Sequence, residues 1–458
     1  MALTSHVSSD NGRPAEWWRA EYPARSSARE TVPQTPPGDV PAAFWSLVAF
    51  TFVLLIAPQT LIPELLLFRL ALLAAGLGVI AVLVDRLLRR QPLSVLPAEV
   101  RLAAGLLVWA VFTTPLSRWP GGSVVFMADI YLKSLVIFWL LANAVTTPRR
   151  LRQLAWALSM MAIPLAMAAV QNFLEGDFIP IPGVKTVPRI FGFDAPLTQN
   201  PNDLALMLNL LLPLTVALFL SRPSPLLRVL LPVAIGLQAV AVILTFSRAG
   251  FLTLIVIGLA YLWKLRRRKR DRGWAMLAVV VGVASLPLLP AGYDARLATM
   301  TDTASDPTGS AQARRQDIYA AVSWIKGHPV IGAGIGQDTL ALNAERGPRW
   351  KALHNVYLQY AVELGLPGFA LFLLLFGSCL RSVARVERAA EDDPALRSLF
   401  HLAGGIQVSL IAFGVAALFH PVGYHFYFYY IAGLAVACKT ASEASGSPVS
   451  EPLDRRLA

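Results

Sequence analysis

The sequence predicts an all-α polytopic membrane protein with about twelve transmembrane helices. Of its 458 residues, 55% are hydrophobic and only 15% are charged, whereas soluble globular chains carry about 25% charged residues. The mean hydropathy is +0.56. The apolar residues gather in runs that approach the roughly 20 residues needed to cross a bilayer. These observations argue against a water-soluble enzyme.

Twelve apolar stretches are expected to form the membrane spans. They are 43–60, 66–85, 102–117, 124–145, 153–173, 203–220, 226–246, 249–263, 274–290, 366–380, 399–419 and 425–438. The short stretches 102–117 and 249–263 are expected to be tilted or partial helices. Residues 1–42 are polar and rich in Pro, Ser and Arg, which predicts a disordered cytoplasmic tail. The transmembrane domain is then 43–440, followed by a second cytoplasmic tail at 441–458.

Basic residues set the predicted orientation. The net charge is +12, and most of the 40 Lys and Arg residues fall on every second connection, including the run Lys264–Arg272. The positive-inside rule therefore places both termini in the cytoplasm. Because the charge is divided among apolar runs, it does not form the basic face of a nucleic-acid-binding protein. The two cysteines, Cys379 and Cys438, fall at inner ends of spans and do not form a disulfide framework.

Two outer connections, 174–202 and 291–365, are long enough to carry a functional site. The second, between spans nine and ten, has helical apolar spacing at Ile318, Ala321, Val322 and Ile325. We expect it to fold over the membrane surface. Functional residues commonly lie on loops that a rigid scaffold holds in place, so the site is predicted on the outer face.

Four clusters of polar and glycine residues lie on this face in the predicted topology. They are Arg189-Ile-Phe-Gly with Gln199-Asn-Pro-Asn202-Asp; Thr245-Phe-Ser-Arg248-Ala-Gly; Arg314-Arg315-Gln-Asp317 with Gly327-His-Pro and Gly332-Ala-Gly-Ile-Gly336; and His354-Asn355-Val-Tyr357-Leu-Gln359 with Glu363-Leu-Gly-Leu-Pro-Gly368. Arginine suits a phosphate-bearing ligand, because its planar fork donates paired hydrogen bonds and stays charged. Several arginines above a membrane chamber fit a lipid-linked pyrophosphate. The alternative is that they contact lipid headgroups or acidic neighbours.

The histidines have less specific signals. His354 is a candidate general base because an imidazole titrates near neutral pH, and the alternative is a structural histidine. Asn355 is a candidate for orienting substrate or for capping a helix. His420 and His425, on the last outer loop, are second-rank candidates for the base, and contact with lipid headgroups is the favoured interpretation. The Gly332–Gly336 run lacks the Lys-Ser/Thr of a P-loop and is predicted to be a turn. No metal-ligand spacing or nucleotide-binding motif is present, so neither a metal nor a cofactor is predicted.

The pattern His354-Asn-x-Tyr-Leu-Gln…Glu363-x-Gly-x-Pro-Gly, preceded by Arg…His-Pro-x-x-Gly-x-Gly, resembles the signature region of the O-antigen ligase and polymerase superfamily. Arg189-x-x-Gly with Asn-Pro-Asn, and the Ser-Arg-x-Gly turn, match the same superfamily. The resemblance covers about residues 45–440. One departure is Tyr319, where the family often has Trp four residues after the arginine. This spacing favours Arg315 over Arg314 as the matching position.

The resemblance implies a membrane glycosyltransferase (GT-C-like) fold with its active site facing the periplasm of a bacterial inner membrane. His354 would activate the acceptor hydroxyl, and Arg189, Arg315 and Arg248 would hold the pyrophosphate. The resemblance also implies substrate contacts by Asn355, Asn202 and Tyr357. The donor would be an undecaprenyl-pyrophosphate-linked glycan and the acceptor would be lipid A–core, with membrane lipids around both. The reaction would invert the configuration of the anomeric carbon and would need no metal ion.

Size and the single large outer loop favour the ligase among the superfamily activities. The alternatives are an O-antigen polymerase and a protein O-oligosaccharyltransferase. From a different class, a transporter or lipid flippase would also explain twelve spans. It predicts charged residues lining mid-membrane positions or broken helices in repeated halves, and neither is evident in the sequence.

Overall fold

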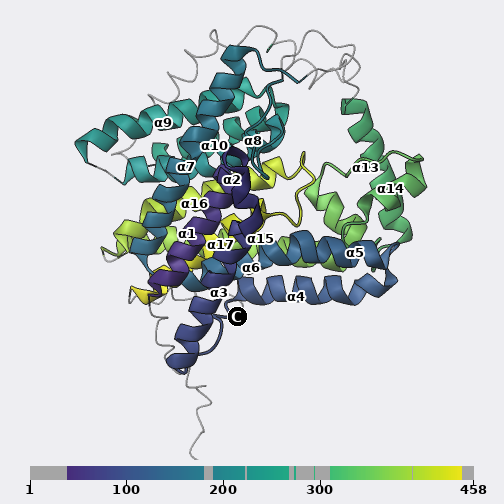
Figure 1. Cartoon of the computed structure of the whole chain (residues 1–458), viewed down its shortest axis with the longest axis horizontal. Helices are drawn as coiled ribbons and strands as arrows, with labels where there is room; N and C mark the ends of the chain where they lie inside the picture. Colours follow the sequence, from purple (N-terminus) through teal and green to yellow (C-terminus); the bar gives the residue numbers. More distant parts are fainter. Residues whose placement is uncertain are drawn as a thin grey trace, which may run out of the picture. The chain divides into compact units, whose positions relative to one another are not determined.

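The computed structural model describes residues 39–179, 189–221, 224–267, 273–274, 293, 310–394 and 396–445. In this part of the chain, regular structure is helical apart from one antiparallel bridge between Phe178 and Ile190. Nine helical stretches among these residues are long and apolar enough to cross a membrane. The protein is thus an all-α, multi-pass membrane protein, as the sequence predicts (Figure 1).

The helices alternate with short connections. They are α1 (Pro41–Ile56), α2 (Pro58–Leu61), the 3₁₀ helix η1 (Pro63–Phe68), α3 (Leu70–Leu88), α4 (Ala98–Thr113), the 3₁₀ helix η2 (Thr114–Leu116), α5 (Pro120–Phe126), the π-helical η3 (Met127–Tyr131), α6 (Leu132–Ala144), α7 (Pro148–Glu175), α8 (Pro201–Leu220), α9 (Pro225–Leu244), α10 (Arg248–Arg266), α13 (Ser310–Gly327), α14 (Asp338–Arg346), α15 (Val356–Asp392), α16 (Arg397–Ala416) and α17 (Phe426–Ala444). Proline opens α1, α5, α7, α8 and α9, a position where its missing N–H costs no hydrogen bond.

Among the described residues, the number of helices long and apolar enough to span a membrane is nine, compared with the twelve spans predicted from the sequence. Nine of the predicted stretches coincide with the nine long apolar helices. The stretch 43–60 corresponds to α1, a shorter apolar helix of 16 residues. The stretch 425–438 corresponds to α17, which is helical but is not among the nine. Apart from Trp274, the stretch 274–290 lies outside the described residues, as do most of the two predicted tails.

Helix extents differ from the predicted stretches at three of the spans. The stretches 102–117 and 249–263 belong to full helical stretches of 19 residues each, not to partial helices. Helix α15 begins at Val356, inside the predicted connection 291–365, and has a non-helical break at Gly365, so the predicted span start near 366 coincides with the helical segment that follows this break. An apolar-run criterion misses its first turns because they hold Gln359 and Glu363, which are polar yet buried.

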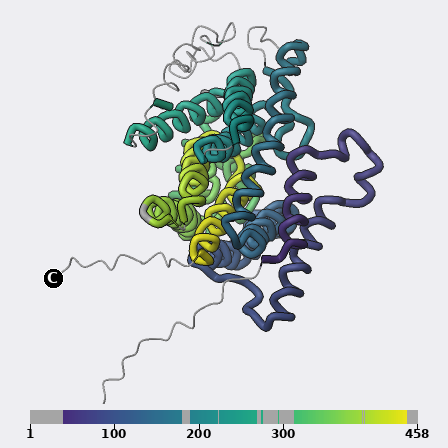
Figure 2. Tube along the Cα trace, turned by 90° about the vertical axis from the view of Figure 1, so that its left-hand side faces the viewer, coloured from purple at the N-terminus to yellow at the C-terminus, as the bar shows by residue number. Residues whose placement is uncertain are grey.

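The helices differ greatly in how much protein covers them. Helix α8 packs against α7, α9, α10 and α16. In its most apolar segment of 18 residues, 78% of the residues are buried. In the stretch 63–88, which contains η1 and α3, the buried share is 11%. Because the exposed side chains there are mostly large and apolar, this surface suits contact with lipid. In Figure 2 the purple segment that contains α2 and η1 stands at the edge of the helical bundle.

Helices α13 and α14 belong to a second, smaller hydrophobic core. Helices α13 and α14 pack on each other and on α15, around Ala321, Trp324 and Leu342. The tip of the α4–α5 hairpin closes this core, where the Arg118 N–H donates to the Ala333 carbonyl at 2.8 Å. Figure 1 shows α13 and α14, in green, beside α5. The helix predicted from the apolar spacing at 318–325 is therefore present as α13.

Candidate active site

An open cavity of about 540 Å³ lies where α10, α13, the residues before α15 and the loop after α16 meet. Its lining residues are Arg248, Ala249, Leu252, Arg314, Arg315, Asp317, Ile318, Tyr319, Leu353, His354, Asn355, Leu418 and Phe419. Three of the four predicted clusters thus contribute to one cavity. Of the seven predicted site residues, Arg248, Arg315, His354 and Asn355 line it, whereas Arg189, Asn202 and Tyr357 do not.

Helix caps explain why the cavity residues occupy fixed positions. The Ser247 hydroxyl accepts from the Gly250 N–H at 3.2 Å and caps α10, which places Arg248 at its first position. The Asn355 side chain accepts from the Leu358 N–H at 3.0 Å and caps α15. Helix N-termini carry partial positive charge. Two such ends together with arginines make the cavity suited to an anion.

His354 has a defined proton arrangement. Its Nδ1 lies 2.9 Å from the Ala352 carbonyl oxygen, and a carbonyl only accepts, so Nδ1 carries the proton. In the neutral ring Nε2 then holds the lone pair that a base needs. Burial, followed by the charge of Arg314, lowers the pKa of His354 below its usual 6.5, although the Ala352 carbonyl, Asp317 and Asp338 oppose this shift. The imidazole is therefore neutral near pH 7.

Two buried groups hold the loop that carries this histidine. The Asp338 carboxylate, at the start of α14, accepts from the Leu353 N–H at 2.6 Å. The buried Arg346, at the end of α14, pairs with Asp317 of α13 and donates to the Lys351 carbonyl at 2.9 Å. Sequence reasoning did not identify Asp338 or Arg346. Nothing local marks them, because the hydrogen-bonded partner of Asp338 is 15 residues away.

Arg189 and Arg248 form a pair of like charges next to the cavity. Burial, followed by the charge of Arg248, lowers the pKa of Arg189. The buried Nε of Arg189 finds no hydrogen-bond partner among the described residues. A desolvated guanidinium beside a second cation is unfavourable unless an anion joins them. Arg189 therefore lies close to Arg248 of the cavity wall, although it does not itself line the cavity.

Arg314 and Arg315 both line the cavity from the first turns of α13. The Arg315 guanidinium lies 3.4 Å from the Tyr319 hydroxyl and is exposed. Arg314 is the arginine whose charge acts on His354. The sequence favoured Arg315 alone. The structure adds Arg314 as a second cavity cation, and the adjacent pair in the sequence was the only signal for it.

Three predicted contacts have structural partners in the protein itself. Asn355 caps α15, as described above. The Tyr357 hydroxyl donates to the Gly414 carbonyl of α16 at 2.7 Å. The Asn202 carbonyl lies 3.3 Å from Nε2 of His420, whose Nδ1 lies 2.9 Å from the Ala416 carbonyl. His420 is buried, so the expectation that it contacts headgroups is wrong. It links the start of α8 to the end of α16.

The glycine run is a turn that packs on the break in α15. Its N–H groups bind α15 rather than an anion: Gly334 N–H donates to the Glu363 carbonyl and Gly336 N–H to the Glu363 carboxylate, both at 2.8 Å. On the other side, Gly365 has φ +66°, and a Cβ there would lie 2.1 Å from the Val330 carbonyl oxygen. Glu363 is buried inside this junction and does not line the cavity.

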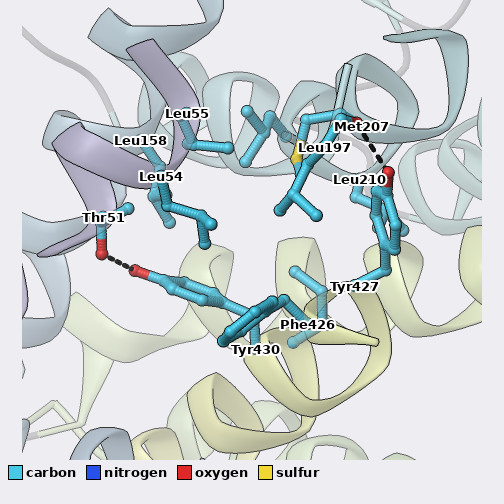
Figure 3. Close-up of a pocket in the computed structure, with 12 residues that line it drawn as sticks. Thr51, Leu54, Leu55, Leu158, Leu197, Met207, Leu210, Phe426, Tyr427 and Tyr430 are labelled. Atoms are coloured by element: carbon cyan, nitrogen blue, oxygen red, sulfur yellow. Dashed lines mark hydrogen bonds between the residues drawn. The ribbon is translucent and has the colours of Figure 1, made fainter. Parts of the chain in front are cut away.

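A second, enclosed pocket has no ionisable group suited to catalysis. It lies among α1, α7, α8 and α17, and its volume is about 20 Å³ (Figure 3). Its tyrosine hydroxyls are already bonded, Tyr430 to Thr51 at 2.8 Å and Tyr427 to the Leu197 carbonyl at 2.6 Å. Within the described chain, no three His, Cys, Asp or Glu side chains form a group able to hold a metal ion.

Comparisons with known proteins give one family match over part of the chain. No curated protein matches the sequence. One similar solved structure is described as "Structural coordination of polymerization and crosslinking by a peptidoglycan synthase complex"; the match is 19% identical, covers 75% of this chain and 98% of that chain, and has a TM-score of 0.38. The family model described as O-Antigen ligase matches residues 233–373. That range contains Arg248, Arg314, Arg315 and His354, so the part of the chain that supplies most of the cavity is similar to the O-antigen ligase family.

Proposed function

We propose that the protein is a metal-independent, inverting glycosyltransferase of GT-C-like architecture. It transfers O-antigen glycan from undecaprenyl-pyrophosphate to lipid A–core at the periplasmic face of a bacterial inner membrane. The observation that carries this proposal is the shared cavity of His354, whose Nδ1 proton is engaged by Ala352, with Arg248, Arg314 and Arg315. The O-antigen ligase match over 233–373 supports the substrate class.

His354 acts as the general base. Its Nε2 takes the proton of the acceptor hydroxyl as that oxygen attacks the anomeric carbon of the donor glycan. The new C–O bond forms as the bond from the anomeric carbon to the pyrophosphate oxygen breaks, and the electron pair leaves with undecaprenyl pyrophosphate. Attack opposite the leaving group inverts the anomeric centre. The imidazolium then releases its proton to water. A lowered pKa keeps the base neutral before the reaction.

The arginines stabilise the leaving group. Positive charge fixed before the reaction is effective because it needs no reorganisation in the transition state. Arg248, Arg314 and Arg315 lie on the cavity wall. Arg189, desolvated beside Arg248, gains a counter-charge when the pyrophosphate binds. Asn355, Asn202 and Tyr357 hold the helices around the site, and we propose that their remaining polar atoms contact sugar hydroxyls.

Reconstituted transfer tests this function. Proteoliposomes that contain the purified protein and an undecaprenyl-pyrophosphate-linked glycan are offered lipid A–core, no acceptor, or a pilin-like peptide. With the wild-type protein we expect the lipid A–core band to shift on a gel as glycan is added. The control variant Lys326→Gln, at an exposed position on α13, should give the same shift. Elongated lipid-linked glycan that forms equally with and without an added acceptor would indicate a polymerase, and product only with the peptide would indicate a protein-modifying enzyme. Movement of the donor across the bilayer without transfer would indicate a flippase.

Single-cysteine labelling tests the orientation. The native Cys379 and Cys438 are buried, so they give little background. We expect a membrane-impermeant reagent to label Lys326→Cys on α13, and not Arg388→Cys in α15, from outside intact spheroplasts. The opposite pattern would place the cavity on the cytoplasmic side and would contradict the proposal.

A further inference from the structure

A surface groove of about 590 Å³ shares no lining residue with the cavity that contains His354. Its walls come from α1, α2, η1, α3, α6 and the first residue of α17. Its lining includes the apolar residues Leu65, Leu70 and Val136 and the polar residues Gln59, Arg69 and Lys133. It therefore combines an aliphatic floor with two cations. The described lining contains no carboxylate.

The two cations are the basic residues that interrupt the predicted spans 66–85 and 124–145. Arg69 joins η1 to α3 with φ +46°, a left-handed conformation that is unfavourable for a residue with a Cβ. Its side chain is exposed. Lys133 pairs with Asp129 one turn earlier at 3.2 Å, as the spacing predicts, and a Lys ammonium retains two further donors. Charged residues on membrane-spanning segments are rare and commonly functional.

Gln59 adds a polar acceptor to the same groove. Its Oε1 is buried and has no hydrogen-bond partner among the described residues. A buried unpaired amide oxygen costs free energy, and a ligand hydroxyl would satisfy it. Arg69, Lys133 and Gln59 are thus three polar groups in an otherwise apolar groove, an arrangement that suits a ligand with a phosphate, hydroxyls and aliphatic chains.

The aliphatic part of such a ligand would lie along the apolar floor of the groove. The groove and the enclosed pocket of Figure 3 share Leu54 and Phe426 as walls. The pocket, at about 20 Å³, holds little more than one water, so it does not extend the groove inward. Next to the groove, η1 exposes Leu66, Leu67 and Phe68, and such an apolar surface suits contact with membrane lipid.

We propose that this groove binds the acceptor lipid, with the phosphate at the base of its glycan on Arg69 and Lys133 and its hydrocarbon chains along the apolar floor. The inference rests on the proposed function, in which donor and acceptor are both lipids. The arginine cavity holds the donor pyrophosphate, and the groove is built from other helices. A separate phosphate site therefore lets both lipids bind at once, while a long oligosaccharide reaches from the groove to His354.

Acceptor kinetics and direct binding test the groove. The variants are Arg69→Gln, Lys133→Gln and the double variant, and Lys326→Gln is the control for the charge change of each single variant. We expect the double variant to raise the KM for lipid A–core about tenfold or more, because two charge-assisted phosphate contacts are lost. The KM for the donor should not change. With dephosphorylated lipid A–core, wild type and double variant should have equal KM values.

Binding without catalysis separates this inference from the proposed function. Native mass spectrometry of the protein in phosphatidylcholine nanodiscs measures retention of added lipid A–core, and the double variant should retain less than Lys326→Gln. If the double variant retained as much lipid A–core as the control and had an unchanged KM for it, the proposal that the groove binds the acceptor would be overturned. Equal retention of phosphatidylglycerol would also overturn it, because the groove would then be an ordinary anionic phospholipid site. If the wild type retains lipid A–core but transfers no glycan, the proposed function is contradicted, whereas the proposal that the groove binds lipid A–core is still supported.

Discussion

The Nδ1 atom of His354 lies 2.9 Å from the carbonyl oxygen of Ala352, two residues earlier in the chain. This contact fixes the tautomer of the imidazole, because a carbonyl oxygen can only accept a hydrogen bond. The peptide around Ala352 is itself fixed, since the next N–H, that of Leu353, donates to the buried Asp338 at 2.6 Å. A short chain of hydrogen bonds thus leads from α14 to the proposed base.

Replacing the base should remove transfer and leave the fold intact. General-base catalysis typically contributes about 10²–10⁴ in rate, so His354→Ala should lower kcat by that order. Donor binding should persist, because the arginines hold the pyrophosphate. Transfer assays with a donor-binding measurement check this. A well-folded His354→Ala protein that transfers glycan at the wild-type rate would remove His354 from the mechanism.

The pH dependence of the transfer rate should reflect the pKa of His354 and the charges near it. Burial and the charge of Arg314 lower the pKa of His354 below 6.5, and the neutral form is the active one. Transfer should therefore stay constant from neutral pH to below 6.5 and fall at lower pH. Arg314→Gln removes a neighbouring cation, which raises this pKa, so its acid limb should shift to higher pH. Rate profiles normalised to each variant's maximum measure the shift. An unchanged limb would show that Arg314 does not act on the base.

Charge alone should not replace the arginine contacts. Arg189→Lys and Arg315→Lys each keep a cation but lose the two-pronged geometry. We expect transfer to fall roughly ten- to hundredfold, the range for losing a hydrogen bond to a charged group. Arg248→Lys should be milder, because the first position of α10 is fixed by the Ser247 cap. Full activity of both Lys variants at 189 and 315, in normally expressed protein, would refute phosphate binding by these side chains.

His420 should make the folded protein sensitive to acid. Burial lowers the pKa of His420 from 6.5 to about 4, whereas the unfolded chain takes up this proton near 6.5. The unfolded state therefore binds more protons in this window, and stability should fall as pH decreases from about 6.5 to about 4. His420→Gln keeps a donor for a backbone carbonyl and removes the titration. Its Tm should depend less on pH than that of the wild type, and an equal dependence would exclude His420 as the cause.

The junction between the glycine turn and α15 can be tested with two glycines of the same helix. Gly365→Ala places a Cβ 2.1 Å from the Val330 carbonyl oxygen at φ +66°, and should cost more than about 2 kcal/mol. Gly377→Ala meets only the Arg381 side chain at 3.9 Å, and should stabilise the helix by up to about 1 kcal/mol. Thermal unfolding in detergent measures both. Equal Tm values for the two variants would contradict the close packing.

The sequence determined the features that depend on local pattern. The bilayer requires runs of apolar residues whose backbone is hydrogen-bonded internally, so span positions follow from composition along the chain. Cap residues act within one turn, so Asn355 as a cap was among the sequence alternatives. Residue types also limit chemistry. Arginines and a histidine between spans indicate an anion-binding site before any packing is known.

Only the tertiary structure decided which of these residues meet. Arg248, Arg314 and His354 lie on three separate elements, and their convergence depends on how α10, α13 and α15 pack. Packing also assigned Tyr357 to the Gly414 carbonyl and His420 to two backbone carbonyls. Such contacts join residues far apart in the chain, and periodicity carries no information about them. Side-chain partners in a buried interior are selected by the geometry of neighbouring helices.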